Sequence, residues 1–132
     1  MKEYTNDQFS VGSKFHTKFI LTDKLAKNLI ESLSIVFQNG KALPAALFST
    51  FINPTLKALG GRFPQGSIHL KQTVEHFGAP FVGDEYEVEV LIADKYVRKG
   101  RDYLVWETIF KKENQVICRQ ESTFLLSFAS NQ

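Results

Sequence analysis

A helix-forming stretch from Pro44 to Gly61 is apolar on nearly every side, and the chain that follows it is predicted to contain only strands. Leu47, Phe48, Phe51 and Ile52 surround this helix and leave little room for a polar face. A helix that is hydrophobic all round is stable only when other elements bury it. We therefore predict an α+β domain in which a sheet of about five or six antiparallel strands wraps around a central apolar helix.

Capping residues predict where two helices begin. Thr22 or Asp23 is a predicted N-cap of a first helix, which ends before the turn signal Asn39-Gly40. In the apolar stretch, Asn53 is predicted to cap a helix that begins at Pro54, because Asn favours the N-cap and Pro favours the first helical position. A glycine pair ends this helix.

The other segments alternate between apolar and polar residues, as half-buried strands do. Predicted strands run from Ser13 to Leu21, Ile68 to Glu75, Glu85 to Ala93, Arg101 to Lys111 and Gln115 to Phe128. The second strand is predicted to have an apolar and a polar face, formed by Ile68, Leu70 and Val74 and by His69, Lys71, Thr73 and Glu75 respectively. Lys99-Gly100 and Glu113-Asn114 are turn signals, so the last three strands are predicted to form an antiparallel meander.

The composition limits the class of protein and its partners. The 132 residues suffice for one domain with one core, and a formal charge of +2 is too small to indicate binding to nucleic acid or an anionic membrane. The single cysteine, Cys118, excludes an internal disulfide and is expected to be a small packed residue in a reducing compartment. The polar N-terminus lacks the apolar core of a signal peptide, so we expect a cytoplasmic protein.

Several short motifs stand in an order known from one protein family. They are Leu21-Thr22-Asp23 at the first helix, Leu43-Pro44 before the apolar helix, Ile68-His69, Ala79-Pro80-Phe81-Val82-Gly83-Asp84 before a long strand, and Lys99-Gly100-Arg101. In these features the chain resembles the MaoC-like hot-dog proteins, especially the N-terminal, dehydratase-like half of double-hot-dog members. The resemblance covers nearly the whole chain and implies the hot-dog fold, in which one sheet wraps one helix.

The resemblance also implies an activity and a partner. Members of this family look like enoyl-thioester hydratases or 3-hydroxyacyl-thioester dehydratases that act on thioesters of coenzyme A or acyl carrier protein. No cofactor and no metal are implied. The family resemblance further implies a dimer with a continuous sheet, either a homodimer or a heterodimer with a catalytic MaoC-like subunit, which would cover an otherwise exposed sheet edge.

The chain departs from the family pattern where the catalytic residues stand. Catalytic members carry an Asp and a His after the first helix, in an Asp-x-Asn-Pro-x-His pattern, which hold a water and exchange its proton with the substrate. Here the matching stretch is Ser34-Ile35-Val36-Phe37-Gln38-Asn39-Gly40, with neither residue. Gln38 and Asn39 can orient a water but cannot accept its proton at neutral pH. We therefore expect a non-catalytic or partner-dependent subunit.

Five residues are predicted to contact a substrate, namely Phe48, Phe51, Ile52, Asn53 and His69. The resemblance suggests that the apolar members, with Trp106, line an acyl-chain cavity. His69 is the one candidate for catalysis, and its alternative role is that of a half-buried histidine bonded to a neighbouring strand. His76 is expected to be a core or interface residue, and His16 a structural one.

Two other functions stay open. A hot-dog thioesterase or a self-sufficient hydratase would use His69 with a water molecule, although no Asp or Glu lies between Pro44 and Gly61 to assist. A structural module without a thioester ligand is the third possibility.

Overall fold

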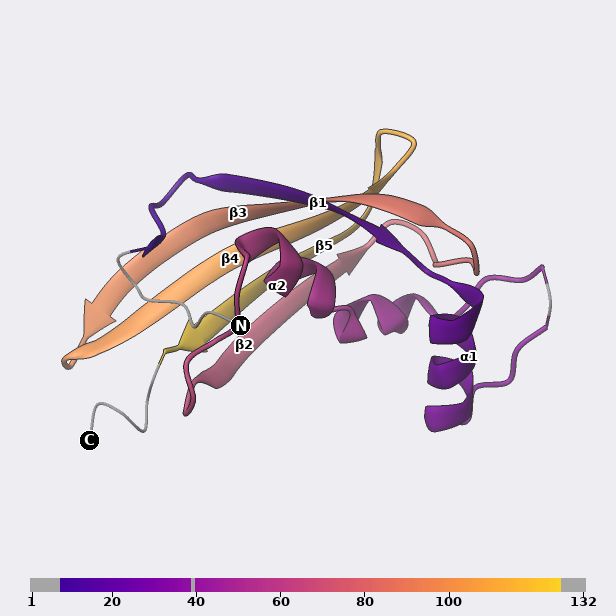
Figure 1. Cartoon of the computed structure of the whole chain (residues 1–132), viewed down its shortest axis with the longest axis horizontal. Coiled ribbons are helices and arrows are strands. Elements are labelled where there is room, and N and C mark those ends of the chain that lie inside the picture. Colours follow the sequence, from indigo (N-terminus) through magenta and orange to yellow (C-terminus); the bar gives the residue numbers. More distant parts are fainter. Residues whose placement is uncertain (1–7, 39, 127–132) are drawn as a thin grey trace.

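The computed structural model describes residues 8–38 and 40–126. Its strands are β1 (Lys14–Ile20), β2 (Ile68–His76), β3 (Glu85–Arg98), β4 (Arg101–Lys112) and β5 (Gln115–Leu125), and its helices are α1 (Asp23–Ser32), the 3₁₀ helix η2 (Ala45–Thr50) and α2 (Asn53–Leu59). In this part of the chain the five strands form one antiparallel sheet in the order β1-β3-β4-β5-β2, with β1 and β2 at its edges. α2 and η2 lie against one face of the curved sheet, and α1 lies beyond one end of it (Figure 1).

The predicted α+β fold is confirmed, and the apolar stretch is interrupted next to Asn53-Pro54, as the sequence predicts. It folds as η2 and α2, with Phe51 and Ile52 between them. Ile52 precedes α2 and no side chain caps this helix, so the predicted N-cap role of Asn53 is wrong and Asn53 is the first helical residue. The predicted stop is confirmed, because Gly60 follows α2 in the left-handed conformation at φ 78°.

The first helix begins as predicted. The Thr22 hydroxyl oxygen accepts a hydrogen bond from the Leu25 N–H at 3.2 Å, and α1 then runs to Ser32. Asn39 of the predicted turn lies outside the described residues, as do residues 127–128 at the end of the last predicted strand. None of the described helices has the length and the hydropathy that a membrane-spanning helix needs.

An aromatic cluster fixes the apolar segment to the sheet. The ring of Phe48, which is fully buried, has its centroid 5.6 Å from Phe51, 5.5 Å from Tyr86 on β3 and 5.3 Å from Phe110 on β4. Phe51 in turn lies 4.8 Å from Phe19 on β1. Tilted and edge-to-face rings at such separations stabilise a core beyond the area that they bury. The core therefore lies between the two short helices and the inner face of the sheet.

Polar side chains also cross this core, and each has a partner. The Gln120 side chain on β5 donates from Nε2 to the carbonyl oxygen of Phe48 at 2.5 Å and accepts at Oε1 from Gln72 on β2 at 2.9 Å. The hydroxyls of Thr55 on α2 and Thr108 on β4 lie 2.8 Å apart, and both residues are 2% exposed. These bonds connect η2 and α2 to specific positions of the sheet.

The two predicted tight turns of the meander are confirmed. Lys99 and Gly100 join β3 to β4 with φ values of 52° and 73°, and Glu113 and Asn114 join β4 to β5 with φ values of 51° and 65°. Two successive residues with positive φ form the turn whose twist matches antiparallel strands, and Gly and Asn adopt it at low cost. The turns therefore set the register of the residues next to them, while the pairing shifts again between Ile92 and Asp94 of β3 and between Phe110 and Lys111 of β4.

The predicted faces of β2 are wrong at one end, because the strand contains a bulge. Its register with β5 shifts between His69 and Lys71, so the extra residue Leu70 has no partner on β5. His69 consequently stacks on Phe124, on the inner face, with ring centroids 4.4 Å apart. Ile68 pairs with Leu125 and does not share this inner face.

The turn before β3 is built around a buried carboxylate. One oxygen of Asp84 accepts from the Phe81 N–H at 2.9 Å and the Tyr86 hydroxyl at 2.7 Å, and the other accepts from Lys112 Nζ at 2.6 Å. Burial alone would raise the pKa of Asp84, but the hydrogen bonds from Lys112, Tyr86 and Phe81 outweigh it and lower that pKa. Burial and the bond to Asp84 raise the pKa of Tyr86.

The threonine pair gives a first prediction. Thr108→Val is expected to lower the free energy of unfolding by about 1–3 kcal/mol, because the Thr55 hydroxyl stays buried and loses its partner. The double variant Thr55→Val/Thr108→Val removes both hydroxyls and is expected to recover most of that loss. Urea titrations of the two single variants, Thr55→Val and Thr108→Val, and of the double variant measure these differences, and losses that simply add in the double variant would contradict the pairing.

Asp84 gives a second prediction, on pH. Its folded pKa lies below its unfolded pKa of about 3.9, so the stability that its charge contributes is present above that pH and is lost as pH falls toward the folded pKa. Asp84→Asn is expected to cost about 1–3 kcal/mol at pH 7. The difference between wild type and variant, from urea titrations at several pH values, should shrink below about pH 4. A difference that stays constant down to pH 2 would refute an ionised Asp84.

Candidate functional site

The five residues that were predicted to bind substrate lie in three separate parts of the structure. Phe48 and Phe51 are packed in the aromatic core, with 0% and 5% of their surface exposed. Trp106 is equally buried, and its ring stacks on Phe63 and Phe124 at 5.1 and 4.6 Å. These side chains belong to the core, and none of them lines the open hollows described below.

Ile52 and Asn53 lie on the exposed side of the same segment. Asn53 lines an open hollow of about 420 Å³ between β1 and α2, within the range of small-molecule sites. We call this the β1–α2 hollow, and it is lined by Lys18, Phe19, Ile20, Asn53, Pro54, Lys57 and Glu85. Ile20 is 49% exposed, so an apolar surface is open there beside polar groups.

The β1–α2 hollow combines four kinds of group, one of which is the exposed carboxylate of Glu85. Phe19, Ile20 and Pro54 give it an apolar floor, and Phe19 packs directly on Phe51 behind it. Lys18 and Lys57 are exposed cations at its rim, and Asn53 adds a neutral amide. Such a lining suits a ligand with an apolar part and anionic groups.

His69 lies across the sheet from this hollow. Its ring is stacked on Phe124, and its Nε2 lies 3.1 Å from the carbonyl oxygen of Lys71 on the same strand. Among the described residues no carboxylate bonds to this imidazole. His69 therefore has no group in the described chain that would hold it as a general base, and it is exposed rather than half-buried.

His76 lies at the other end of β2 and faces Cys118. Its Nδ1 is 4.0 Å from Cys118 Sγ, and its ring centroid is 6.3 Å from that of Phe48. Cys118 is fully buried, as expected for a packed residue, and burial raises the pKa of its thiol to about 11. The thiol is thus protonated at neutral pH and is a poor nucleophile.

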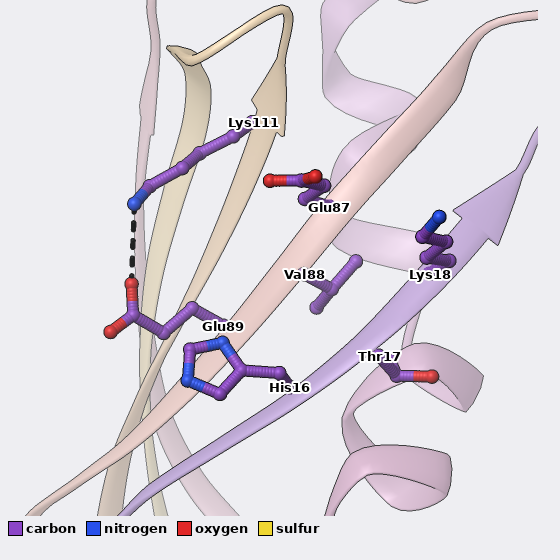
Figure 2. Close-up of a pocket in the computed structure, with 7 residues that line it drawn as sticks. All are labelled: His16, Thr17, Lys18, Glu87, Val88, Glu89 and Lys111. Atoms are coloured by element: carbon purple, nitrogen blue, oxygen red, sulfur yellow. Dashed lines mark hydrogen bonds and ion pairs between the residues drawn. The ribbon is translucent and has the colours of Figure 1, made fainter.

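A second hollow, of about 430 Å³, lies over β1, β3 and β4 and is shown in Figure 2. We call it the charged hollow, and it is lined by His16, Thr17, Lys18, Glu87, Val88, Glu89 and Lys111. His16 and Glu89 are direct partners in the β1–β3 register, and Figure 2 shows the imidazole beside the Glu89 side chain. Sequence reasoning treated His16 as structural and missed this arrangement.

Glu89 is held in the charged hollow by two lysines. Lys14 Nζ lies 3.4 Å and Lys111 Nζ 3.3 Å from its carboxylate oxygens. Burial opposes ionisation, but the bonds and charges of Lys111 and Lys14 prevail and lower the pKa of Glu89. Because these cations already neutralise the carboxylate, it is a weak proton acceptor. The charged hollow is therefore better suited to holding strands together than to proton transfer.

The segment between α1 and η2 lies beyond the end of the sheet (Figure 1). This is where the family pattern places its acid–base residues. Gln38 is exposed, and its backbone carbonyl accepts from the Lys41 N–H at 3.1 Å. Leu33 and Val36 expose 52% and 96% of their surface. The segment rejoins the fold where the Leu43 N–H donates to the Pro80 carbonyl at 2.7 Å. Its described part is thus an apolar, exposed loop without an ionisable side chain before Lys41.

Comparison with known proteins gives matches in structure alone. No protein-family model and no curated protein matches the chain. The (R)-hydratase from A. caviae involved in PHA biosynthesis has a TM-score of 0.64 at 19% identity, over 89% of this chain and 97% of that one. The HadBC (3R-hydroxyacyl-ACP dehydratase) complex of Mycobacterium tuberculosis gives 0.70 at 13% identity, over 87% and 96%. A MaoC-like dehydratase from Rhodospirillum rubrum gives 0.65 at 15% identity, over 91% and 94%.

These similarities extend over most of each chain, although few residues are identical. The overall fold is therefore common to all of them. The predicted resemblance to MaoC-like hot-dog proteins is confirmed in the fold. The chain is a hot-dog domain of the kind found in MaoC-like dehydratases and (R)-hydratases.

Proposed function

We propose that this chain binds acyl thioesters of coenzyme A or acyl carrier protein and does not itself hydrate or dehydrate them. The fold supports the first part, because the solved hot-dog neighbours include an (R)-hydratase and a hydroxyacyl-ACP dehydratase. The loop between α1 and η2 supports the second part, because residues 33–40 contain neither Asp nor His. Turnover would then require the acid–base residues of a catalytic MaoC-like subunit. The single buried thiol fits a cytoplasmic setting for such a protein.

The β1–α2 hollow is the site that supports thioester binding best. Its apolar floor suits a hydrocarbon chain, and Lys18 and Lys57 suit phosphate groups, such as those of coenzyme A. Asn53, which lines the same hollow, adds an amide that can donate a hydrogen bond to a carbonyl. This combination of groups is the observation that carries the proposal.

The test begins with binding and turnover measured on the same protein. Acyl-coenzyme A thioesters of increasing chain length are expected to raise the melting temperature in thermal-shift assays. The same samples are expected to hydrate crotonyl-coenzyme A no faster than buffer. Hydration that His69→Ala abolishes would overturn the proposal in favour of a self-sufficient hydratase. The absence of any stabilisation by acyl thioesters would favour a structural module.

A charge reversal tests the proposed location. Lys57→Glu is expected to weaken binding of an acyl-coenzyme A by roughly tenfold or more in isothermal titration calorimetry, because a charge-assisted bond is replaced by repulsion. Arg98→Glu is the matched control, since Arg98 is an exposed cation at the opposite end of β3 from Glu85. Equal losses in both variants would point to a general charge effect and against the β1–α2 hollow.

A further inference from the structure

The β1–α2 hollow contains a carboxylate as well as its two lysines. Glu85 lies at the start of β3 and is the direct partner of Ile20 in the β1–β3 register, so both side chains project from the same face of the sheet. Lys18 lies two residues before Ile20 and shares that face, whereas Lys57 belongs to α2. With two cations and one anion in its lining, the hollow has one excess positive charge.

A third hollow, of about 520 Å³, adjoins the β1–α2 hollow. Lys18 and Glu85 line both of them, so a ligand that extends past these two residues enters the third hollow. We call it the acidic hollow, because Glu87 and Glu113 also line it. Glu87 is the direct partner of Lys18 in the β1–β3 register and therefore lies on the same face of the sheet as Glu85.

Two further lysines line the acidic hollow, but both are already bound to carboxylates. Lys112 Nζ lies 2.6 Å from an oxygen of Asp84, and Lys111 Nζ lies 3.3 Å from an oxygen of Glu89. The three glutamates of the acidic hollow, by contrast, form no ion pair with any residue that the structure describes. An anionic group that enters the acidic hollow would therefore meet carboxylates whose charge no bonded cation neutralises.

The two candidate carriers of an acyl group differ in charge beyond the part that they share. Both attach the acyl group to a pantetheine arm that ends in a phosphate. In acyl carrier protein this phosphate is a single diester. In coenzyme A the arm continues into a nucleotide, which brings a diphosphate and a further phosphate. One excess positive charge matches the single diester, whereas like charges brought close together at an interface oppose binding.

We propose that Glu85 selects the carrier of the acyl group. In this proposal the β1–α2 hollow takes the phosphopantetheine arm of acyl carrier protein, with its phosphodiester at Lys18 and Lys57. Glu85 disfavours coenzyme A by repelling the phosphates of its nucleotide, because it lies where the β1–α2 hollow meets the acidic hollow. The inference rests on the proposed thioester function and adds a residue that determines specificity by charge.

Isothermal titration calorimetry with three probes tests this selection. The probes are octanoyl-coenzyme A, the S-octanoyl thioester of phosphopantetheine methyl ester, which has one phosphodiester, and S-octanoyl pantetheine, which has no phosphate. At low ionic strength the methyl ester is expected to bind the wild-type chain roughly tenfold more tightly than octanoyl-coenzyme A, because the charges of these exposed groups are then poorly screened. It is also expected to bind more tightly than S-octanoyl pantetheine.

Glu85→Gln removes the charge and keeps the shape of the side chain. This variant is expected to lose most of the preference, chiefly because octanoyl-coenzyme A binds more tightly. Glu75→Gln is the matched control, since Glu75 is an exposed carboxylate on β2, at the opposite edge of the sheet from β1, and its removal is expected to leave the preference unchanged. A Glu85→Gln variant that keeps the wild-type preference would overturn the inference.

The wild-type measurements separate this inference from the proposed function. Equal or tighter binding of octanoyl-coenzyme A would overturn the selection by Glu85 and leave the thioester site in place. If none of the three probes binds, the proposed thioester function fails and the inference fails with it. Raising the ionic strength from about 0.02 M to about 0.5 M is expected to reduce the preference, because exposed charges are screened. A preference that does not change with salt would assign it to the shape of the hollow and contradict the role of Glu85.

Discussion

The bond from Gln120 to the backbone of Phe48 is the contact on which the position of the apolar segment depends. The Phe48 carbonyl already accepts from the Phe51 N–H within the 3₁₀ turn, and Gln120 ties that same oxygen to the middle of β5. The burial of apolar surface alone is not directional, so it would let the segment slide along the inner face. Because Gln120 is the side-chain donor that the sheet supplies to this carbonyl, the bond specifies one position of the segment, and the Phe48 ring then enters the core between Tyr86 and Phe110.

Much of the sheet could be predicted because its determinants are local. Alternation along β3 places Tyr86 inside and Glu85 outside, and the two-residue turns at Lys99-Gly100 and Glu113-Asn114 have a positive φ that few sequences adopt cheaply. The start of α1 is also set locally, because the Thr22 hydroxyl oxygen accepts from the backbone N–H of Leu25, three residues later. Each of these features is encoded within a few neighbouring residues.

The features that the sequence did not reveal depend on distant partners. The bulge at Leu70 exists because β2 must match β5, about 50 residues away in the chain, and it moves His69 to the inner face. His16 meets Glu89 only through the pairing of β1 with β3, so the charged hollow has no local signal beyond the alternation of charge on each strand. The candidate site residues were scattered for the same reason, because separate strands and helices carry them.

The strand order also has a consequence for how the chain folds. The meander β3-β4-β5 closes through two-residue turns, whereas His76 of β2 meets Cys118 of β5 across 42 residues of chain. Contacts between residues that are far apart in the sequence form late. The intervening chain must lose conformational entropy to close the loop before these contacts can stabilise the fold. The edge that β2 presents therefore comes into existence near the end of folding. A nascent chain would thus present no ordered β2 edge until its own meander is complete.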